Sequence, residues 1–235
     1  MNTTPGVTPV PTQDAVAFCQ QMRLPTQRLP MLGDPNGFAH DNVVYNALKD
    51  VHGSAESSAE LLGRITNDLT VTEPVRHEMA AKVANQLAAT AEATQRTLET
   101  RAKDHMAACE SVMGSRFVPD PVRTPIYMRC LDWVAREAQN GDGGYTNIRE
   151  AVTEDPDFAL TMYNHSWRLM GLPEDVVLGF KEKVVAKFAP EALEHIESST
   201  KLDRLAKRYP GFIAKVHASF YSPLELAKLR TRVEV

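Results

Sequence analysis

The sequence predicts an all-α protein, and three observations support that prediction. Apolar residues recur at helical spacing, and no stretch of useful length alternates between apolar and polar residues as a strand would. Seven prolines stand where the first turn of a helix can accept them. Residues 75–113 contain neither glycine nor proline, which indicates one long helix over about residues 74–113. We expect an extended Pro-rich N-terminal arm before this helix and a C-terminal multi-helix bundle after it.

The arm is assigned to residues 1–38. This segment holds six of the fifteen prolines, and each proline pushes the residue before it toward extended conformations. A short helix is expected only from Thr12 to Arg23. The segment is too apolar for a solvated linker, so it is expected to lie along a surface of this chain or of a neighbour. Its candidate partner-contact residues are Phe18, Leu24, Leu29 and Leu32.

Residues 39–116 are expected to form a helical region that contains the long helix. One short helix is predicted from Asp41 to Val51. Ser57 and Glu60 have the spacing of a capping box, which predicts that another helix begins there.

The long helix is predicted to be longer than the diameter of the domain that the rest of its own chain can form beside it. Its 39 uninterrupted residues span ~60 Å, whereas a domain of ~110 residues is only ~35 Å across. One face follows a straight helical period with mostly small side chains, and its larger members Leu87, Leu98, Met106 and Met113 are candidate partner contacts. The pattern leaves two interpretations open: packing against this chain's own bundle, or packing between subunits.

Residues 124–235 are assigned to the C-terminal bundle, after a linker in the sequence RFVPDPVRTP. The seven prolines expected to begin helices are Pro74, Pro125, Pro156, Pro173, Pro190, Pro210 and Pro223. The glycine-rich stretch NGDGGYTN (residues 140–147) is interpreted as a flexible connection, because it lacks the ligand pattern of a calcium loop and the ending of a phosphate loop. The stretch YNHSWRLMG (residues 163–171) fits either a binding surface or a core helix, and the core is favoured.

No catalytic, cofactor-binding or metal-binding pattern emerges from the sequence. His77-Glu78 lacks the second histidine of a zinc-protease helix, since position 81 is Ala81. Three cysteines at irregular spacing indicate free thiols rather than a disulfide framework. We find neither a secretory signal nor a membrane span, so synthesis in the cytoplasm is expected.

Charge is distributed unevenly along the chain. The net charge is −4, yet the last 35 residues carry +5. The candidate basic patch is Lys201, Arg204, Lys207, Arg208, Lys228, Arg230 and Arg232. Aromatic residues interleave with these cations, so the segment could contact nucleic acid through phosphates and stacking. Docking on an acidic surface of another copy, or simple solvation of amphipathic helices, is favoured over that interpretation.

These features lead to a functional hypothesis: a non-enzymatic structural or assembly protein that packs into a larger homo- or hetero-oligomeric particle. Its partners are other copies of itself or other assembly proteins, and no cofactor is expected. Arms and long helices are typical of virus and phage virions, where the chain would be an accessory or connector-type component. The alternative is a nucleic-acid-associated helical protein that uses its basic C-terminal segment.

Overall fold

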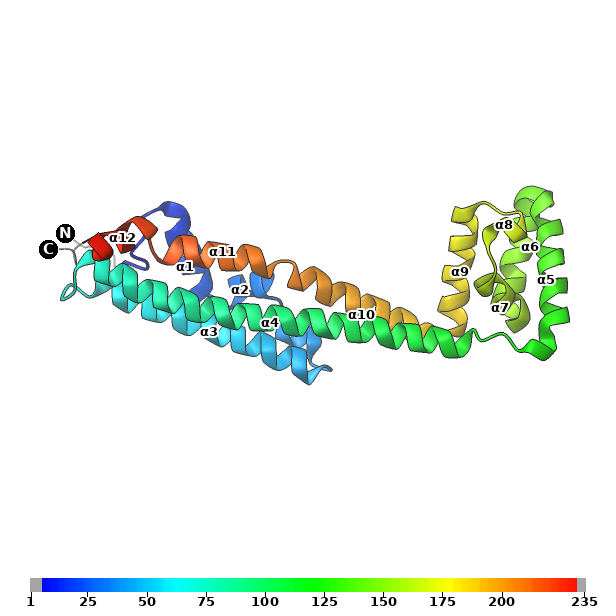
Figure 1. Cartoon of the computed structure of the whole chain (residues 1–235), viewed down its shortest axis with the longest axis horizontal. Coiled ribbons are helices and arrows are strands. Elements are labelled where there is room, and N and C mark those ends of the chain that lie inside the picture. The colour runs from blue at the N-terminus through cyan, green and yellow to red at the C-terminus, as the bar shows by residue number, and fades with distance from the viewer. Residues whose placement is uncertain (1–5, 232–235) are drawn as a thin grey trace. The chain divides into compact units, whose positions relative to one another are not determined.

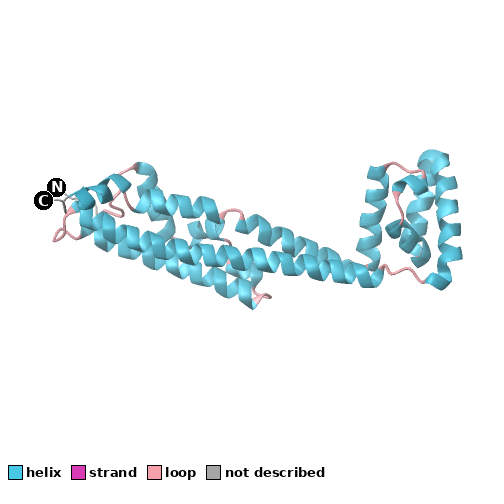
Figure 2. Cartoon of the chain, viewed as in Figure 1, coloured by secondary structure: helices cyan, strands magenta, loops and turns pink. Residues whose placement is uncertain are grey.

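The structure is a computed structural model that describes residues 6–231, and every regular element in that range is helical (Figures 1 and 2). The α-helices are α1 (Gln13–Arg23), α2 (Pro25–Leu32), α3 (Asn42–Asn67), α4 (Glu73–Arg116), α5 (Thr124–Glu137), α6 (Gly141–Glu154), α7 (Pro156–Asn164), α8 (Trp167–Met170), α9 (Glu174–Phe188), α10 (Pro190–Ala206), α11 (Tyr209–Phe220) and α12 (Pro223–Thr231). Short 3-10 turns are η1 (Pro35–Phe38), η2 (Pro121–Arg123) and η3 (Ala138–Asn140). The all-α prediction and the single long helix are confirmed.

The chain divides into two compact units. Unit 1 combines residues 1–102 with residues 201–235, and unit 2 comprises residues 103–200. The boundaries fall inside α4 and α10, so each of these helices contributes to both units. This division differs from the three consecutive segments expected from the sequence, because the end of the chain returns to the unit in which the chain began.

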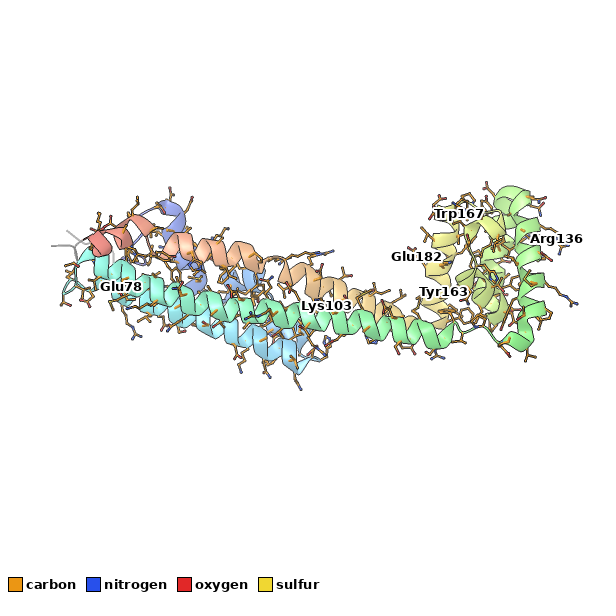
Figure 3. The ribbon with its side chains drawn as sticks, viewed as in Figure 1. Glu78, Lys103, Arg136, Tyr163, Trp167 and Glu182 are labelled. Carbon is orange, nitrogen blue, oxygen red and sulfur yellow. The ribbon has the colours of Figure 1, made fainter. Side chains whose placement is uncertain are left out.

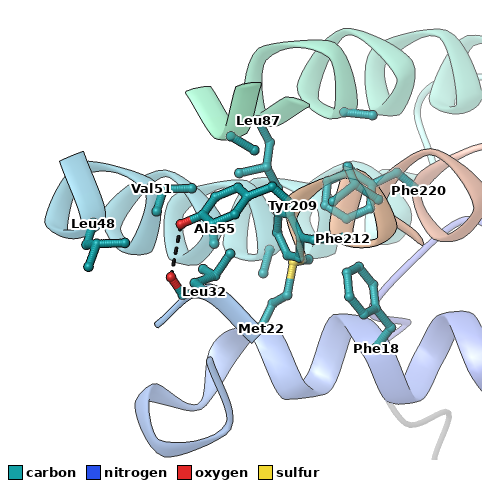
Figure 4. Close-up of a cluster of buried hydrophobic side chains, with 14 of the residues drawn as sticks. Phe18, Met22, Leu32, Leu48, Val51, Ala55, Leu87, Tyr209, Phe212 and Phe220 are labelled. Carbon is teal, nitrogen blue, oxygen red and sulfur yellow. Dashed lines mark hydrogen bonds between the residues drawn. The ribbon is translucent and has the colours of Figure 1, made fainter. Parts of the chain in front are cut away.

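Unit 1 is a helical bundle built around α3 and the first part of α4. Helix α1 packs on α2, α3 and α11, and Figure 4 shows side chains from these elements meeting in one cluster. The buried Tyr209 hydroxyl donates a hydrogen bond of 2.9 Å to the Leu32 carbonyl oxygen, joining α11 to the end of α2. Phe18 and Phe212 contact each other with ring centroids 5.9 Å apart. Residues nearly 200 positions apart therefore close this core.

The short helix predicted from Thr12 to Arg23 is confirmed as α1, whereas the extended conformation predicted for residues 24–38 is wrong, because these residues form α2 and η1. Local propensity allowed extended chain, but the apolar residues of this segment gain more by packing on α3 and α11. Leu32 is fully buried there. Residues 6–12 do lack helix, and they too lie on this chain: the Thr8 hydroxyl donates to the Ser219 carbonyl oxygen at 2.5 Å. Residues 1–5, which include Pro5 of the predicted arm, lie outside the described residues.

The predicted break before Ser57 is also wrong, because α3 runs unbroken over 26 residues. Ser57 lies inside this helix and donates its hydroxyl to the Gly53 carbonyl oxygen at 2.9 Å instead of capping a new helix. Val51, Ala55 and Leu62 are fully buried on one side of α3, and this continuous apolar face outweighs the weak helix propensity of glycine.

The long helix α4 covers 44 residues, and much of its small-residue face packs on this same chain. Leu87, Ala91 and Leu98 are fully buried in unit 1, and the Thr94 hydroxyl donates to the Ala47 carbonyl oxygen of α3 at 3.2 Å. In unit 2, Cys109 joins the core. Of the two interpretations left open by the sequence, packing within the chain accounts for these residues.

Unit 2 forms its core mainly from α5 to α9, with α7 packed against α5, α6 and α9 (Figure 1). Aromatic contacts contribute to this core. Trp133 meets Phe158 edge-on with ring centroids 5.0 Å apart, and Phe117 stacks on Tyr163 with ring centroids 4.1 Å apart. All seven prolines predicted to begin helices do stand at helix starts, as the first residue, its neighbour or the cap. The predicted linker is confirmed as the irregular segment between α4 and α5, with the turn η2 inside it.

The glycine-rich stretch is the start of α6 rather than a flexible connection. Gly141 has a φ of +59°, which glycine adopts without strain, and it ends the preceding turn. Gly144 is buried against α5, where an added Cβ would lie 1.8 Å from the Glu137 carbonyl oxygen. These glycines permit a tight turn and a close approach of backbones, which composition alone does not distinguish from flexibility.

Candidate protein-docking surface

A surface groove of about 380 Å³ lies on unit 1 between α1, α2 and α11. Its lining residues are Phe18, Pro30, Met31, Lys207, Arg208, Gly211, Phe212 and Lys215. Apolar side chains from three helices form the floor, and three cations border it. The groove therefore offers both an apolar contact and a positive rim.

Helix α11 supplies the pattern that makes this groove. Arg208 is the N-cap of α11, Phe212 follows it by four residues and Lys215 follows Gly211 by four, so these residues lie on one side of the helix. Phe212 is buried and forms part of the floor. Gly211 is exposed, and a Cβ added there would meet no atom within 4 Å. The absence of a side chain at Gly211 thus keeps the middle of this face open.

The three rim cations differ in their contacts within the chain. Lys207 pairs with Asp203 at 2.5 Å, but its side chain remains 73% exposed. The Arg208 guanidinium donates to the Pro30 carbonyl oxygen at 3.2 Å, which ties α2 to the start of α11. Lys215 is exposed on α11. Lys215 is therefore the rim cation that a substitution can change without removing a described contact.

The candidate partner-contact residues fall into two groups. Phe18, Leu32, Leu87 and Leu98 are core residues of unit 1. Leu24, Leu29 and Met106 are exposed, and Met113 is half-buried. Only Phe18 among the eight lines the groove.

The candidate basic patch is not one continuous surface in the groove. Lys207 and Arg208 line it, whereas Lys201 and Arg204 are exposed on α10 and Lys228 pairs with Glu225 on α12 at 2.6 Å. Arg230 lies in α12, and Arg232 lies outside the described residues. The sequence missed Gly211, Pro30 and Met31 as groove residues, because nothing in their local pattern shows that α2 meets α11.

The aromatic residues that interleave with these cations are mostly inaccessible. Tyr209 and Phe220 are fully buried, Phe212 is 5% exposed and Tyr221 is half-buried. Burial also raises the pKa of the Tyr209 hydroxyl. Base stacking needs an open aromatic face, so this segment offers cations to a partner but little aromatic surface.

The side chains of the three cysteines and of His77 are buried. Burial raises the pKa of Cys19 to about 12, and it also raises the pKa values of Cys109 and Cys130, which keeps all three as thiols at neutral pH. His77 is 2% exposed, and its Nδ1 accepts a hydrogen bond of 3.0 Å from the Ser222 backbone N–H. Burial lowers the pKa of His77. Within residues 6–231, no three His, Cys, Asp or Glu side chains are grouped to hold a metal ion.

The stretch around Trp167 combines core and surface residues. Met162 and Met170 are fully buried in unit 2, in agreement with the favoured core interpretation. Leu169 is 60% exposed, and Arg168 lies over the Trp167 ring at 5.2 Å.

Comparison of the chain with protein-family models, with curated proteins and with solved structures gave no match. Among the helices of the described part of the chain, none is long and apolar enough to cross a membrane.

Proposed function

We propose that the protein is a non-enzymatic structural or assembly subunit that packs into a larger homo- or hetero-oligomeric particle. The observation that carries this proposal is the groove of unit 1, where an apolar floor adjoins three cations at the surface. Apolar contact supplies the free energy of association between proteins, while charges at the rim orient the partner and set its identity. A virus or phage particle, with this chain as an accessory or connector-type component, is one such assembly.

Unit 2 supports the proposal with exposed apolar side chains. Val122 is 85% exposed, Val118 62% and Leu178 55%. Single exposed apolar residues are ordinary on monomers, so these residues support the proposal only together with the groove.

The test is the binding of a labelled amphipathic peptide of about 18 residues, or five helical turns, made of Glu, Leu and Ala. We expect micromolar binding, measured by fluorescence anisotropy, and weaker binding of the matched peptide in which Lys replaces Glu. Gly211→Trp should block the groove, whereas Gly211→Ala, which adds only a Cβ into open space, should leave binding unchanged. Equal binding of both peptides, or binding unaffected by Gly211→Trp, would contradict the proposal.

Nucleic-acid association is the second candidate, and the exposed cations of α10 and α11 favour it. It ranks lower because the neighbouring aromatic rings are buried and Asp203 neutralises Lys207. A salt titration of DNA and RNA binding decides between the two. Lys207→Glu with Lys215→Glu should reduce the slope of log affinity against log salt if phosphates bind here, and an unchanged slope would eliminate this candidate.

A further inference from the structure

Helix α9 of unit 2 carries an exposed face on which acidic side chains surround a leucine. Its charge is opposite to that of the cations that border the groove of unit 1. Leu178 is 55% exposed, and Glu174, Asp175 and Glu182 are exposed around it. Residues four apart lie on one face of a helix, so Glu174, Leu178 and Glu182 form a single row. Figure 3 shows Glu182 on the side of α9 that faces away from α5.

This acidic face is more than the usual enrichment of acids at a helix start. Glu174 and Asp175 stand in the first turn of α9, where they also stabilise the helix N-terminus. Glu182 stands two turns further on and has no such role. Lys183 and Lys187 occupy the opposite flank of α9. Lys181 lies beside the acidic row, but it is half-buried and its Nζ lies 5.8 Å from the centroid of the Tyr163 ring.

The spacing of charges on α9 matches the spacing on α11. Glu174 and Glu182 are eight residues apart, or ~12 Å along the helix, with Leu178 midway. Arg208 and Lys215 are seven residues apart, or ~10 Å, with Gly211 and Phe212 midway. The leucine of α9 would thus meet the open centre of the groove while each carboxylate meets a cation.

The charge of the two units favours the same pairing. Residues 103–200 carry ten Lys or Arg against sixteen Asp or Glu, a formal charge of −6, whereas the rest of the chain carries sixteen against fourteen, or +2. Unit 2 of one copy is therefore attracted to unit 1 of another, and this attraction steers their encounter.

We infer that the occupant of the groove is a second copy of this chain, which packs Leu178 of α9 against Met31 and the open position at Gly211, over the floor formed by Phe18 and Phe212. Glu174 and Glu182 of that copy then face the rim cations, including Lys215. The two surfaces differ, so the contact is head-to-tail and repeats into rings or open filaments. This inference rests on the proposed function and names its partner.

Paired charge reversals test the contact in the full-length chain. Lys215→Glu and Glu182→Lys should each weaken self-association at least about tenfold, measured by mass photometry and sedimentation velocity, because each brings like charges together. A 1:1 mixture of the two variants restores an opposite-charge pair at both kinds of contact, so its association should return to within about threefold of wild type. Lys49→Glu and Glu150→Lys are matched reversals on α3 and α6, outside both surfaces, and should have no effect.

Each outcome decides the inference. Loss of association in the single variants with recovery in the mixture supports it, and circular dichroism shows that the variants remain folded. A chain that stays monomeric at every concentration, or a mixture that fails to recover, overturns it. In those cases binding of the acidic peptide still decides the proposed function, because that assay does not depend on self-association.

Discussion

Unit 1 closes its core with helices from both ends of the chain, whereas unit 2 closes its core with helices that follow one another in sequence. In unit 1, Thr8 bonds to Ser219 and Tyr209 bonds to Leu32, so its stability depends on contacts across most of the chain. In unit 2, α5 to α9 pack on their near neighbours in sequence. Local contacts form with less loss of chain entropy, so unit 2 is the unit expected to form first during folding.

The two proposed contact surfaces also differ in how the chain forms them. The groove needs Phe18, Met31 and Phe212 brought together from distant positions. The α9 face needs only one helix with the right sequence. A change in the core of unit 1 is therefore expected to disrupt the groove, while the α9 face should survive it.

The largest expected effects come from placing a charge in each core. Met22 and Met162 are both fully buried, in unit 1 and unit 2 respectively. Met22→Asp and Met162→Asp each bury an unpaired carboxylate, at a cost above about 4 kcal/mol. Hydrogen exchange should show that Met22→Asp removes protection from α1 and α11 but not from α5 to α7, and that Met162→Asp does the reverse. Loss of protection throughout the chain in both variants would show that the units are not independent.

The next largest effect is a difference in stability between alanine substitutions at two neighbouring glycines of unit 2. Gly144→Ala forces a Cβ against the Glu137 carbonyl oxygen, which should destabilise unit 2 by about 1–3 kcal/mol. Gly143→Ala meets no atom within 4 Å and improves helix propensity, so it should stabilise unit 2 by about 0.5–1 kcal/mol. Urea unfolding followed by tryptophan fluorescence measures both, since Trp133 and Trp167 lie in unit 2. Equal effects of the two substitutions would show that the close approach at Gly144 is not a constraint.

A smaller effect tests the long-range closure of unit 1. Tyr209→Phe removes the hydrogen bond to the Leu32 carbonyl oxygen and should lower the free energy of unfolding by about 1–2 kcal/mol. Tyr163→Phe is the control in unit 2, because the Tyr163 hydroxyl forms no hydrogen bond among the described residues. Chemical denaturation followed by circular dichroism is the measurement. A loss no greater than that of the control would indicate that this bond adds nothing to the closure.

The smallest effect is a dependence of unit 1 on pH. Burial lowers the pKa of His77 in the folded chain, so the unfolded chain binds the proton first as the pH falls. Stability from neutral His77 is therefore complete above about pH 6.5, the ordinary pKa of histidine, and declines as the pH falls from there toward the folded pKa. Hydrogen exchange near Ser222, whose N–H donates to His77, should rise over this window. His77→Gln does not titrate, and an unchanged pH profile in that variant would remove His77 as the cause.

Much of the fold is predictable from this sequence, because prolines and the run without glycine or proline determine where helices begin and continue through local backbone geometry. Pro156 and Pro223 begin helices for the same reason in any context: a first helical turn does not need their missing N–H. The errors occur where distant residues decide. Leu32 gains burial from α3 and α11, and Gly144 is constrained by Glu137.

The candidate site was only partly predictable for the same physical reason. Lys207 and Arg208 were found from charge, and Phe18 was found from its place in an apolar segment. The open position at Gly211 and the acidic face of α9 can be recognised only when the structure shows which faces of α11 and α9 are exposed. Burial of Leu87 and Leu98 in this chain moves the expected contact between copies from the long helix to these two surfaces.

Sedimentation velocity of the full-length chain over a concentration series, from about 0.1 M to about 1 M salt, tests most directly whether copies assemble through opposite charges. The Debye length falls from about 10 Å to about 3 Å over this range, so charge pairing is progressively screened. The predicted result is association that grows with concentration and weakens as salt is added. A single monomeric species under all these conditions, or association that strengthens with salt, would contradict it.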